Sequence, residues 1–167
     1  MKYNRFEELP VWKDAASLAA DIYRWSSQTV FRGKGDLANQ LQRAALSISN
    51  NIAEGFERGT TSELLAFLYY ARGSAGEVRS MLCVMDMMGD FNNLKSEISN
   101  FKSKSESIAR QIRGWANSLQ NINIAGQRHL NSNSKAVYDS EKRADAFMQK
   151  IDKMVEDARE KRGGAIV

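Results

Sequence analysis

The sequence predicts an all-α protein, namely an antiparallel up-down-up-down four-helix bundle with an extra C-terminal helix. Three observations predict this fold. Apolar residues recur at alternating spacings of four and three over long stretches, which places them on one face of a helix. The single proline, Pro10, lies near the start, so the rest of the chain has no helix breaker of this kind. Val and Thr are scarce, whereas Ala, Leu, Ser, Lys and Arg are common.

The first helix is predicted to begin near Leu9 and Pro10, because proline is tolerated in a first helical turn. Residues 26–36 contain two glycines and predict a loop, with Asp36 as the N-cap of the next helix. The apolar stripe of the first helix consists of Val11, Ala15, Leu18, Ile22 and Trp25.

The second helix is predicted to stop near Arg58 and Gly59. Thr60, Thr61 or Ser62 then caps the third helix, and Thr60 with Glu63 three residues later resembles a capping box. The apolar stripe of the second helix consists of Leu37, Leu41, Ala44, Ala45, Ile48, Ile52 and Gly55, and that of the third of Leu64, Leu68, Ala71, Ala75, Val78, Leu82 and Met85.

The third helix is predicted to end at Gly89, and Asn92 or Asn93 to open the fourth. We expect residues 1–119 to form the four-helix bundle, residues 120–133 a polar linker and residues 134–167 a C-terminal amphipathic helix. The stripe of the fourth helix consists of Leu94, Ile98, Phe101, Ser105, Ile108, Ile112, Trp115 and Leu119, and that of the C-terminal helix includes Phe147, Ile151 and Met154.

Composition gives no indication of an enzyme. Cys83 is the only cysteine and His129 the only histidine, and neither lies in a metal-binding or nucleophile motif, so we expect no metal and no cofactor. No apolar run reaches the length that spans a bilayer, and the N-terminal segment is too acidic for a secretory signal. We therefore expect a cytoplasmic protein without membrane contact. A net charge of +4 permits nucleic-acid binding without arguing strongly for it.

A polar face on the predicted second helix and a face of small residues on the third can each be interpreted in two ways. The second helix carries a polar set away from its core, which is either a recognition face for phosphate or carboxylate, or a packing interface between helices or subunits. Small residues on the third helix indicate either a ligand groove or a close contact with another helix, in the same or a neighbouring subunit. We favour packing in both cases. The residues concerned are Arg43, Ser47, Asn50, Asn51, Glu54 and Arg58 on the second helix, and Arg72, Gly73 and Gly76 on the third.

Basic residues of the fourth helix outnumber its acidic residues, and such a face is usually solvated. If several subunits repeat the face around a ring, the charges add up to a field that attracts nucleic acid. The candidate nucleic-acid-binding residues are Lys95, Lys102, Lys104, Arg110 and Arg113.

Several blocks of residues follow one another in order along residues 5–119. They are Val11-Trp12, Gln40, Arg43-Ala44-Ala45, Ser47-Ile48, Asn51-Ile52-Ala53-Glu54-Gly55, Arg58, Ala71-Arg72-Gly73-Ser74 and Glu77. With these blocks the sequence closely resembles the four-helix bundle family of bacterial 23S rRNA intervening-sequence proteins. Ser49 stands where the family usually has proline, the loop around Gly33 lacks the common Phe-Pro pattern, and the chain extends past Leu119.

The resemblance implies a non-enzymatic bundle that assembles into a homopentameric ring of basic character. Related bundles are accessory variability determinants of diversity-generating retroelements, which associate with a reverse transcriptase and its RNA. The first functional hypothesis is therefore an oligomeric accessory protein that binds nucleic acid, RNA above all, or a nucleic-acid enzyme such as a reverse transcriptase. The alternative is a protein-interaction scaffold whose C-terminal helix captures a protein partner through Phe147, Ile151 and Met154.

Overall fold

The computed structural model describes residues 3–120, 140, 143–151 and 153–154. Every regular element among these residues is helical, which confirms the all-α fold class. The described residues fall into two parts, the bundle of residues 3–120 and a helical stretch within residues 140–154. Each part is considered by itself.

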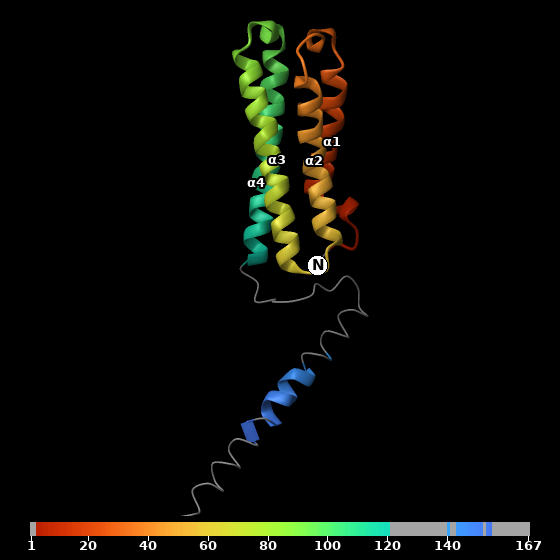
Figure 1. Ribbon diagram of the computed structural model, residues 1–167, viewed down its shortest axis with the longest axis vertical. Helices are drawn as coiled ribbons and strands as arrows, with labels where there is room; N and C mark the ends of the chain where they lie inside the picture. Colours follow the sequence, from red (N-terminus) through yellow and green to blue (C-terminus); the bar gives the residue numbers. More distant parts are fainter. Residues whose placement is uncertain (1–2, 121–139, 141–142, 152, 155–167) are drawn as a thin grey trace, which may run out of the picture. The chain divides into compact units, whose positions relative to one another are not determined.

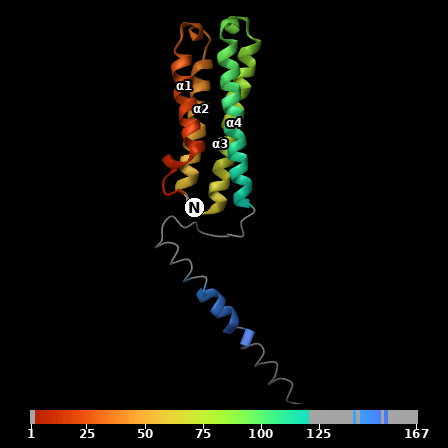
Figure 2. The same cartoon turned by 180° about the vertical axis from the view of Figure 1, so that it is seen from behind.

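Four long helices form the bundle: α1 (Pro10–Ser26), α2 (Leu37–Glu57), α3 (Thr61–Met87) and α4 (Lys95–Gln120). Helix α1 packs against α2 and α4, and α3 packs against the same two helices, so the four surround one core. The α1–α2 and α3–α4 connections lie at one end and the α2–α3 connection at the other (Figures 1 and 2). This arrangement confirms the up-down-up-down topology.

The core consists of the apolar stripes that the four-three spacing predicts. Most of the predicted positions are fully buried, whereas Leu37, Leu94, Trp115 and Leu119 are half-buried near helix ends. Ser105 is the polar member of the α4 stripe, and its buried hydroxyl donates a 2.8 Å hydrogen bond to the Phe101 carbonyl. That bond meets the hydrogen-bonding need of a hydroxyl inside an apolar core.

Short 3-10 helices close one end of the bundle. Besides η1 (Phe6–Glu8), the chain forms η2 (Thr29–Phe31) before α2 and η3 (Gly89–Leu94) before α4. Phe31 from η2 and Phe91 from η3 are buried, with ring centroids 5.3 Å apart, and Trp25 lies 5.0 Å from Phe31. The predicted loop thus contributes to the core. The predicted start of the fourth helix at Asn92 or Asn93 is wrong, because both residues lie in η3.

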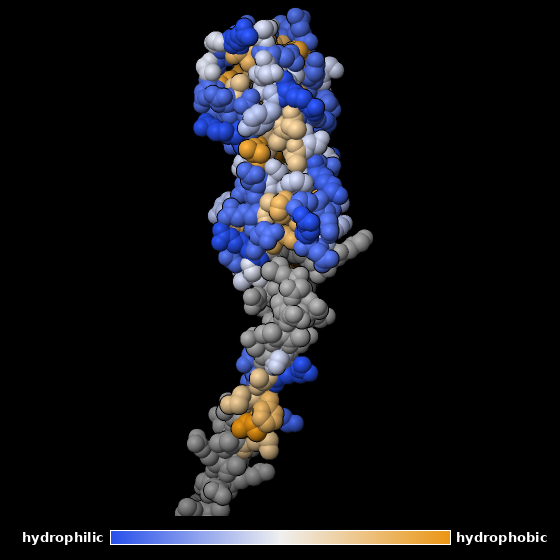
Figure 3. Space-filling model, turned by 90° about the vertical axis from the view of Figure 1, so that its right-hand side faces the viewer, coloured by the Kyte–Doolittle hydropathy of each residue, from blue (hydrophilic) through white to orange (hydrophobic). Residues whose placement is uncertain are grey.

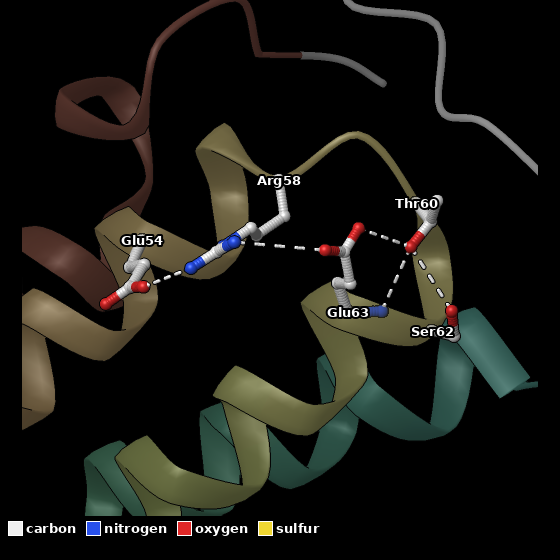
Figure 4. A network of polar contacts seen from close by, with 5 residues as sticks. All are labelled: Glu54, Arg58, Thr60, Ser62 and Glu63. Carbon is white, nitrogen blue, oxygen red and sulfur yellow. Dashed lines mark hydrogen bonds and ion pairs between the residues drawn. The ribbon is translucent and has the colours of Figure 1, made fainter.

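The α2–α3 junction has the predicted cap. The Thr60 hydroxyl accepts a hydrogen bond from the Glu63 amide at 3.2 Å and donates one to the Glu63 carboxylate at 2.7 Å. Arg58 lies 2.6 Å from Glu54 and 3.9 Å from Glu63, so it joins the end of α2 to the start of α3 (Figure 4). Asp36 occupies the predicted N-cap position of α2, but the predicted capping by its side chain is wrong. The carboxylate makes no cap hydrogen bond and lies 3.3 Å from Arg43.

Gly55 allows α2 and α3 to approach closely. A Cβ atom at this position would lie 2.7 Å from Phe67 Cβ and 3.3 Å from Leu64 Cδ1, so a larger residue would push the helices apart. Gly73 and Gly76 differ, since a Cβ atom at either would meet nothing within 4 Å. The predicted close helix contact at these two glycines does not occur within the described bundle.

The second part contains a helical segment at residues 143–151. Phe147 is 62% exposed and Met154 59% exposed, and Ile151 is also exposed. Figure 3 shows hydrophobic side chains gathered on this segment. Gln120, the first residue of the predicted linker, belongs to α4. Residues 121–133 of the predicted linker lie outside the described residues, and so does the predicted C-terminal helix apart from residues 140, 143–151 and 153–154.

Candidate functional site

A groove of about 530 Å³ runs between α3 and α4 on the surface of the bundle. Both helices contribute residues from the faces next to their core stripes. The lining residues are Tyr69, Arg72, Gly73, Ala75, Gly76 and Arg79 from α3 and Ser105, Glu106, Ala109, Arg110 and Arg113 from α4.

The groove is strongly basic, because it holds four arginines and one acidic residue. Arg110 lies 2.9 Å from Glu106 one turn earlier on α4. Arg72, Arg79 and Arg113 are exposed, and none of them forms an ion pair within the part of the chain that the structure describes. Three guanidinium groups can therefore bind an anion. Arginine is suited to phosphate because its planar guanidinium group donates two parallel hydrogen bonds.

Helical periodicity explains how one chain builds both walls. Arg72 and Arg79 are seven residues apart on α3, so they lie on the same face two turns apart. Arg110 and Arg113 are three apart on α4 and share a face in the same way. Because α3 and α4 pack against each other, these two faces line one groove.

Glycines and one tyrosine shape the groove. Gly73 and Gly76 add no side chain to the α3 wall, and the space beyond each Cα is open. Tyr69 is 43% exposed, and its hydroxyl accepts a 2.6 Å hydrogen bond from Gln120 Nε2. The Tyr69 ring is thus held at one end of the groove by α4.

The five predicted nucleic-acid-binding residues do not form one surface. Arg110 and Arg113 line the groove. Lys102 is 3.4 Å from Asp86 of α3, whereas Lys104 is 2.8 Å from Asp21 of α1 and so lies on a different side of α4. Lys95 is exposed at the first residue of α4, outside the groove.

The α3 residues predicted for packing line this groove, and their contact with a neighbouring subunit stays a prediction. Arg72, Gly73 and Gly76 join Arg110 and Arg113 there, which favours the ligand-groove interpretation of the small residues over close helix contact within the chain. Sequence reasoning missed Arg79. Its spacing of seven from Arg72 was the available signal.

The polar face of α2 mainly serves contacts within the bundle. Ser47 Oγ lies 2.9 Å from Ser74 Oγ of α3, and half-buried Asn51 donates to the Ser47 carbonyl at 2.7 Å. Asn50 is exposed, and exposed Glu54 pairs with Arg58. Ser47 and Asn51 therefore pack between helices of the bundle, whereas a contact of Asn50 and Glu54 with another subunit stays a prediction.

Other candidate sites have little support. Among the residues that the structure describes, no group of three or more His, Cys, Asp and Glu side chains could hold a metal ion, and His129 lies outside them. Cys83 is half-buried. No helix in the described ranges is both long and apolar enough to cross a membrane.

A known protein family matches most of the bundle. Residues 7–114, more than half of the chain, match the family described as 23S rRNA-intervening sequence protein. The chain belongs to this family. Every residue that lines the α3–α4 groove lies within the part of the chain that matches the 23S rRNA-intervening sequence protein family. No curated protein sequence matches the chain at a significant level.

Proposed function

We propose that this family member is a non-enzymatic protein that binds nucleic acid, RNA above all, and that the α3–α4 groove holds the phosphate backbone. The observation that carries the proposal is the set of three exposed groove arginines, Arg72, Arg79 and Arg113, without an acidic partner in the described bundle. Cationic side chains that neutralise phosphates release condensed counterions, which drives binding. The family description names a ribosomal RNA sequence, and this favours RNA as the ligand.

The proposal extends to assembly and partners. We propose a cytoplasmic homo-oligomer, a pentamer by the resemblance noted above, in which each subunit repeats the groove and the electrostatic fields add. A nucleic-acid enzyme such as a reverse transcriptase is the protein partner that the same resemblance favours. Light scattering of the full chain measures the subunit number.

The test measures RNA affinity by fluorescence anisotropy at several salt concentrations. The double variant Arg79→Gln/Arg113→Gln is expected to weaken binding by at least about tenfold at low salt, because two phosphate contacts are lost. The slope of log affinity against log salt should fall by about 1.4 for a single strand.

The matched control is Lys13→Gln/Arg32→Gln. Both residues are exposed and basic, form no ion pair with another described residue and lie outside the groove. This variant has the same net charge as the groove variant, so equal losses in the two would indicate non-specific attraction and contradict a groove site. No detectable RNA binding by the full-length wild-type protein at about 50 mM salt would contradict the function itself.

A second candidate function, capture of a protein partner, rests on the exposed apolar side chains of the C-terminal segment. Phe147, Ile151 and Met154 are all exposed, and apolar side chains at this spacing suit a helix that binds a groove. The variant Phe147→Ser/Ile151→Ser is expected to lose the partner and to keep RNA affinity. Retained capture of a partner by this variant would contradict the second candidate.

A further inference from the structure

Besides its basic charge, the groove between α3 and α4 is short and concave and has an aromatic side chain at one end. We propose that it binds one strand of nucleic acid, not a duplex, with phosphates between the arginines of the two walls and one base stacked on Tyr69. This inference rests on the proposed function, since it names the form of nucleic acid that the same site takes.

The length of the groove favours a single strand. Tyr69 and Arg79 are ten residues apart on α3, which corresponds to about 15 Å along the helix. Proteins that recognise double-stranded RNA by its shape spread their contacts over about 16 base pairs, a much longer distance. The groove is also concave between two helices packed about 8–10 Å apart, so a flexible strand can enter it more deeply than a rigid duplex.

The arginines are placed along the groove as a strand requires. Arg72 and Arg79 are separated by about 10 Å along α3, and Arg110 and Arg113 by about 4.5 Å on the facing wall. A strand that runs along the groove therefore meets guanidinium groups from both sides at several successive points. Glu106 engages Arg110 at 2.9 Å, so it holds that side chain against α4 and leaves the three other arginines to the phosphates.

Tyr69 supplies a surface for a base. Proteins that bind single strands combine a basic groove with aromatic side chains, because every base has a face that stacks. The Tyr69 ring is partly exposed beside the basic residues, and the hydrogen bond from Gln120 to its hydroxyl restricts its rotation. Gly73, one turn further along α3, leaves room for the stacked nucleotide.

The first experiment compares three fluorescein-labelled probes on the full chain. The probes are a single-stranded RNA of about 12 nucleotides, the DNA of the same sequence and the RNA annealed to its complement. Both single strands are expected to bind about tenfold more tightly than the duplex. Tyr69→Leu is expected to weaken single-strand binding about tenfold and duplex binding less than twofold, whereas Tyr69→Phe keeps the ring and stays within about twofold of the wild type.

The outcomes separate this inference from the proposed function. Equal affinity for duplex and single strand, together with no effect of Tyr69→Leu, overturns the single-strand site but leaves RNA binding intact if Arg79→Gln/Arg113→Gln still loses affinity. Absence of binding to all three probes overturns both.

A second experiment fills the groove without weakening the fold. Gly73→Leu/Gly76→Leu adds bulk where a Cβ meets nothing and replaces two poor helix formers, so the variant should unfold at a higher temperature than the wild type. It is expected to lose single-strand binding at least about tenfold, while the control Gly73→Ala/Gly76→Ala stays within about threefold. Retained binding in the Leu variant overturns the inference. Loss of binding accompanied by dissociation of the oligomer in light scattering also overturns it, because the groove would then be a subunit contact.

Discussion

The ammonium group of Lys104 donates a 2.8 Å hydrogen bond to the carboxylate of Asp21 and so joins α4 to α1. This hydrogen bond is the main cause that holds the pKa of Asp21 below its ordinary value, and a hydrogen bond from Arg24 acts in the same direction, while burial opposes both. Lys104 thus contributes to the fold of the bundle, although its position on the basic fourth helix made it a candidate for nucleic-acid binding.

Asp21→Asn is expected to make stability less dependent on pH. Because the pKa of Asp21 is lower in the folded than in the unfolded state, its contribution is complete above the unfolded value of about 3.9 and is lost as pH falls through the folded value. The variant should lose up to about 1 kcal/mol of unfolding free energy at pH 7, since the pair is partly exposed. Urea denaturation at pH 7, 5, 4 and 3 measures this. A deficit that does not become smaller between pH 5 and pH 3 would show that the effect is not due to ionised Asp21.

The same substitution should have opposite effects at two glycines. Gly55→Ala places a Cβ 2.7 Å from Phe67 Cβ, so overpacking of about 1–3 kcal/mol outweighs the gain of about 1 kcal/mol in helix propensity. Gly73→Ala meets nothing within 4 Å and should stabilise the protein by about 0.5–1 kcal/mol. Thermal unfolding of the two variants beside the wild type measures the sign of each change. A higher midpoint for Gly55→Ala than for the wild type would contradict the close α2–α3 approach.

Thr60→Ala is expected to lower the free energy of unfolding by about 1 kcal/mol. The change removes the acceptor of the Glu63 amide and leaves the first turn of α3 without its side-chain cap. Thr60→Ser keeps the hydroxyl and should lose only a few tenths of a kcal/mol, which makes it the matched control. Chemical denaturation of both variants gives the comparison, and equal losses would show that the methyl group of Thr60 matters more than its hydroxyl.

Lys102→Gln and Arg113→Gln should separate pairing within the bundle from ligand binding. Lys102 already pairs with Asp86, so its replacement should change RNA affinity less than twofold and stability by less than about 0.5 kcal/mol. Arg113 has no such partner in the described bundle, so its replacement should weaken RNA binding several-fold, lower the salt slope by about 0.7 and leave the unfolding midpoint unchanged. Anisotropy titrations with thermal unfolding of the same samples measure both quantities. A larger loss of RNA affinity for Lys102→Gln than for Arg113→Gln would contradict the groove site.

Much of the fold was predictable because the spacing of apolar residues along a helix determines which face of the helix they occupy. The stripe from Leu64 to Met85 repeats at four and three residues, and the structure buries every member of it. The Thr60 cap was equally readable, since its bonds join residues three apart. Phe31 and Phe91 could not be placed in this way. They lie in short 3-10 turns without periodicity, and they are buried where the α1–α2 connection meets the α3–α4 connection.

The candidate site was predictable only in fragments. Arg72 and Gly73 stood out on one helix and Arg110 and Arg113 on another, and the two groups received different interpretations. The sequence by itself determined the helices, their buried faces and the family, because each depends on local spacing or on ordered blocks of residues. Only the tertiary structure decided which basic residues pair within the bundle and which share a groove. That outcome depends on which helices are neighbours and on which side of α4 each charge lies, as Lys104 beside Asp21 and Arg113 beside α3 demonstrate.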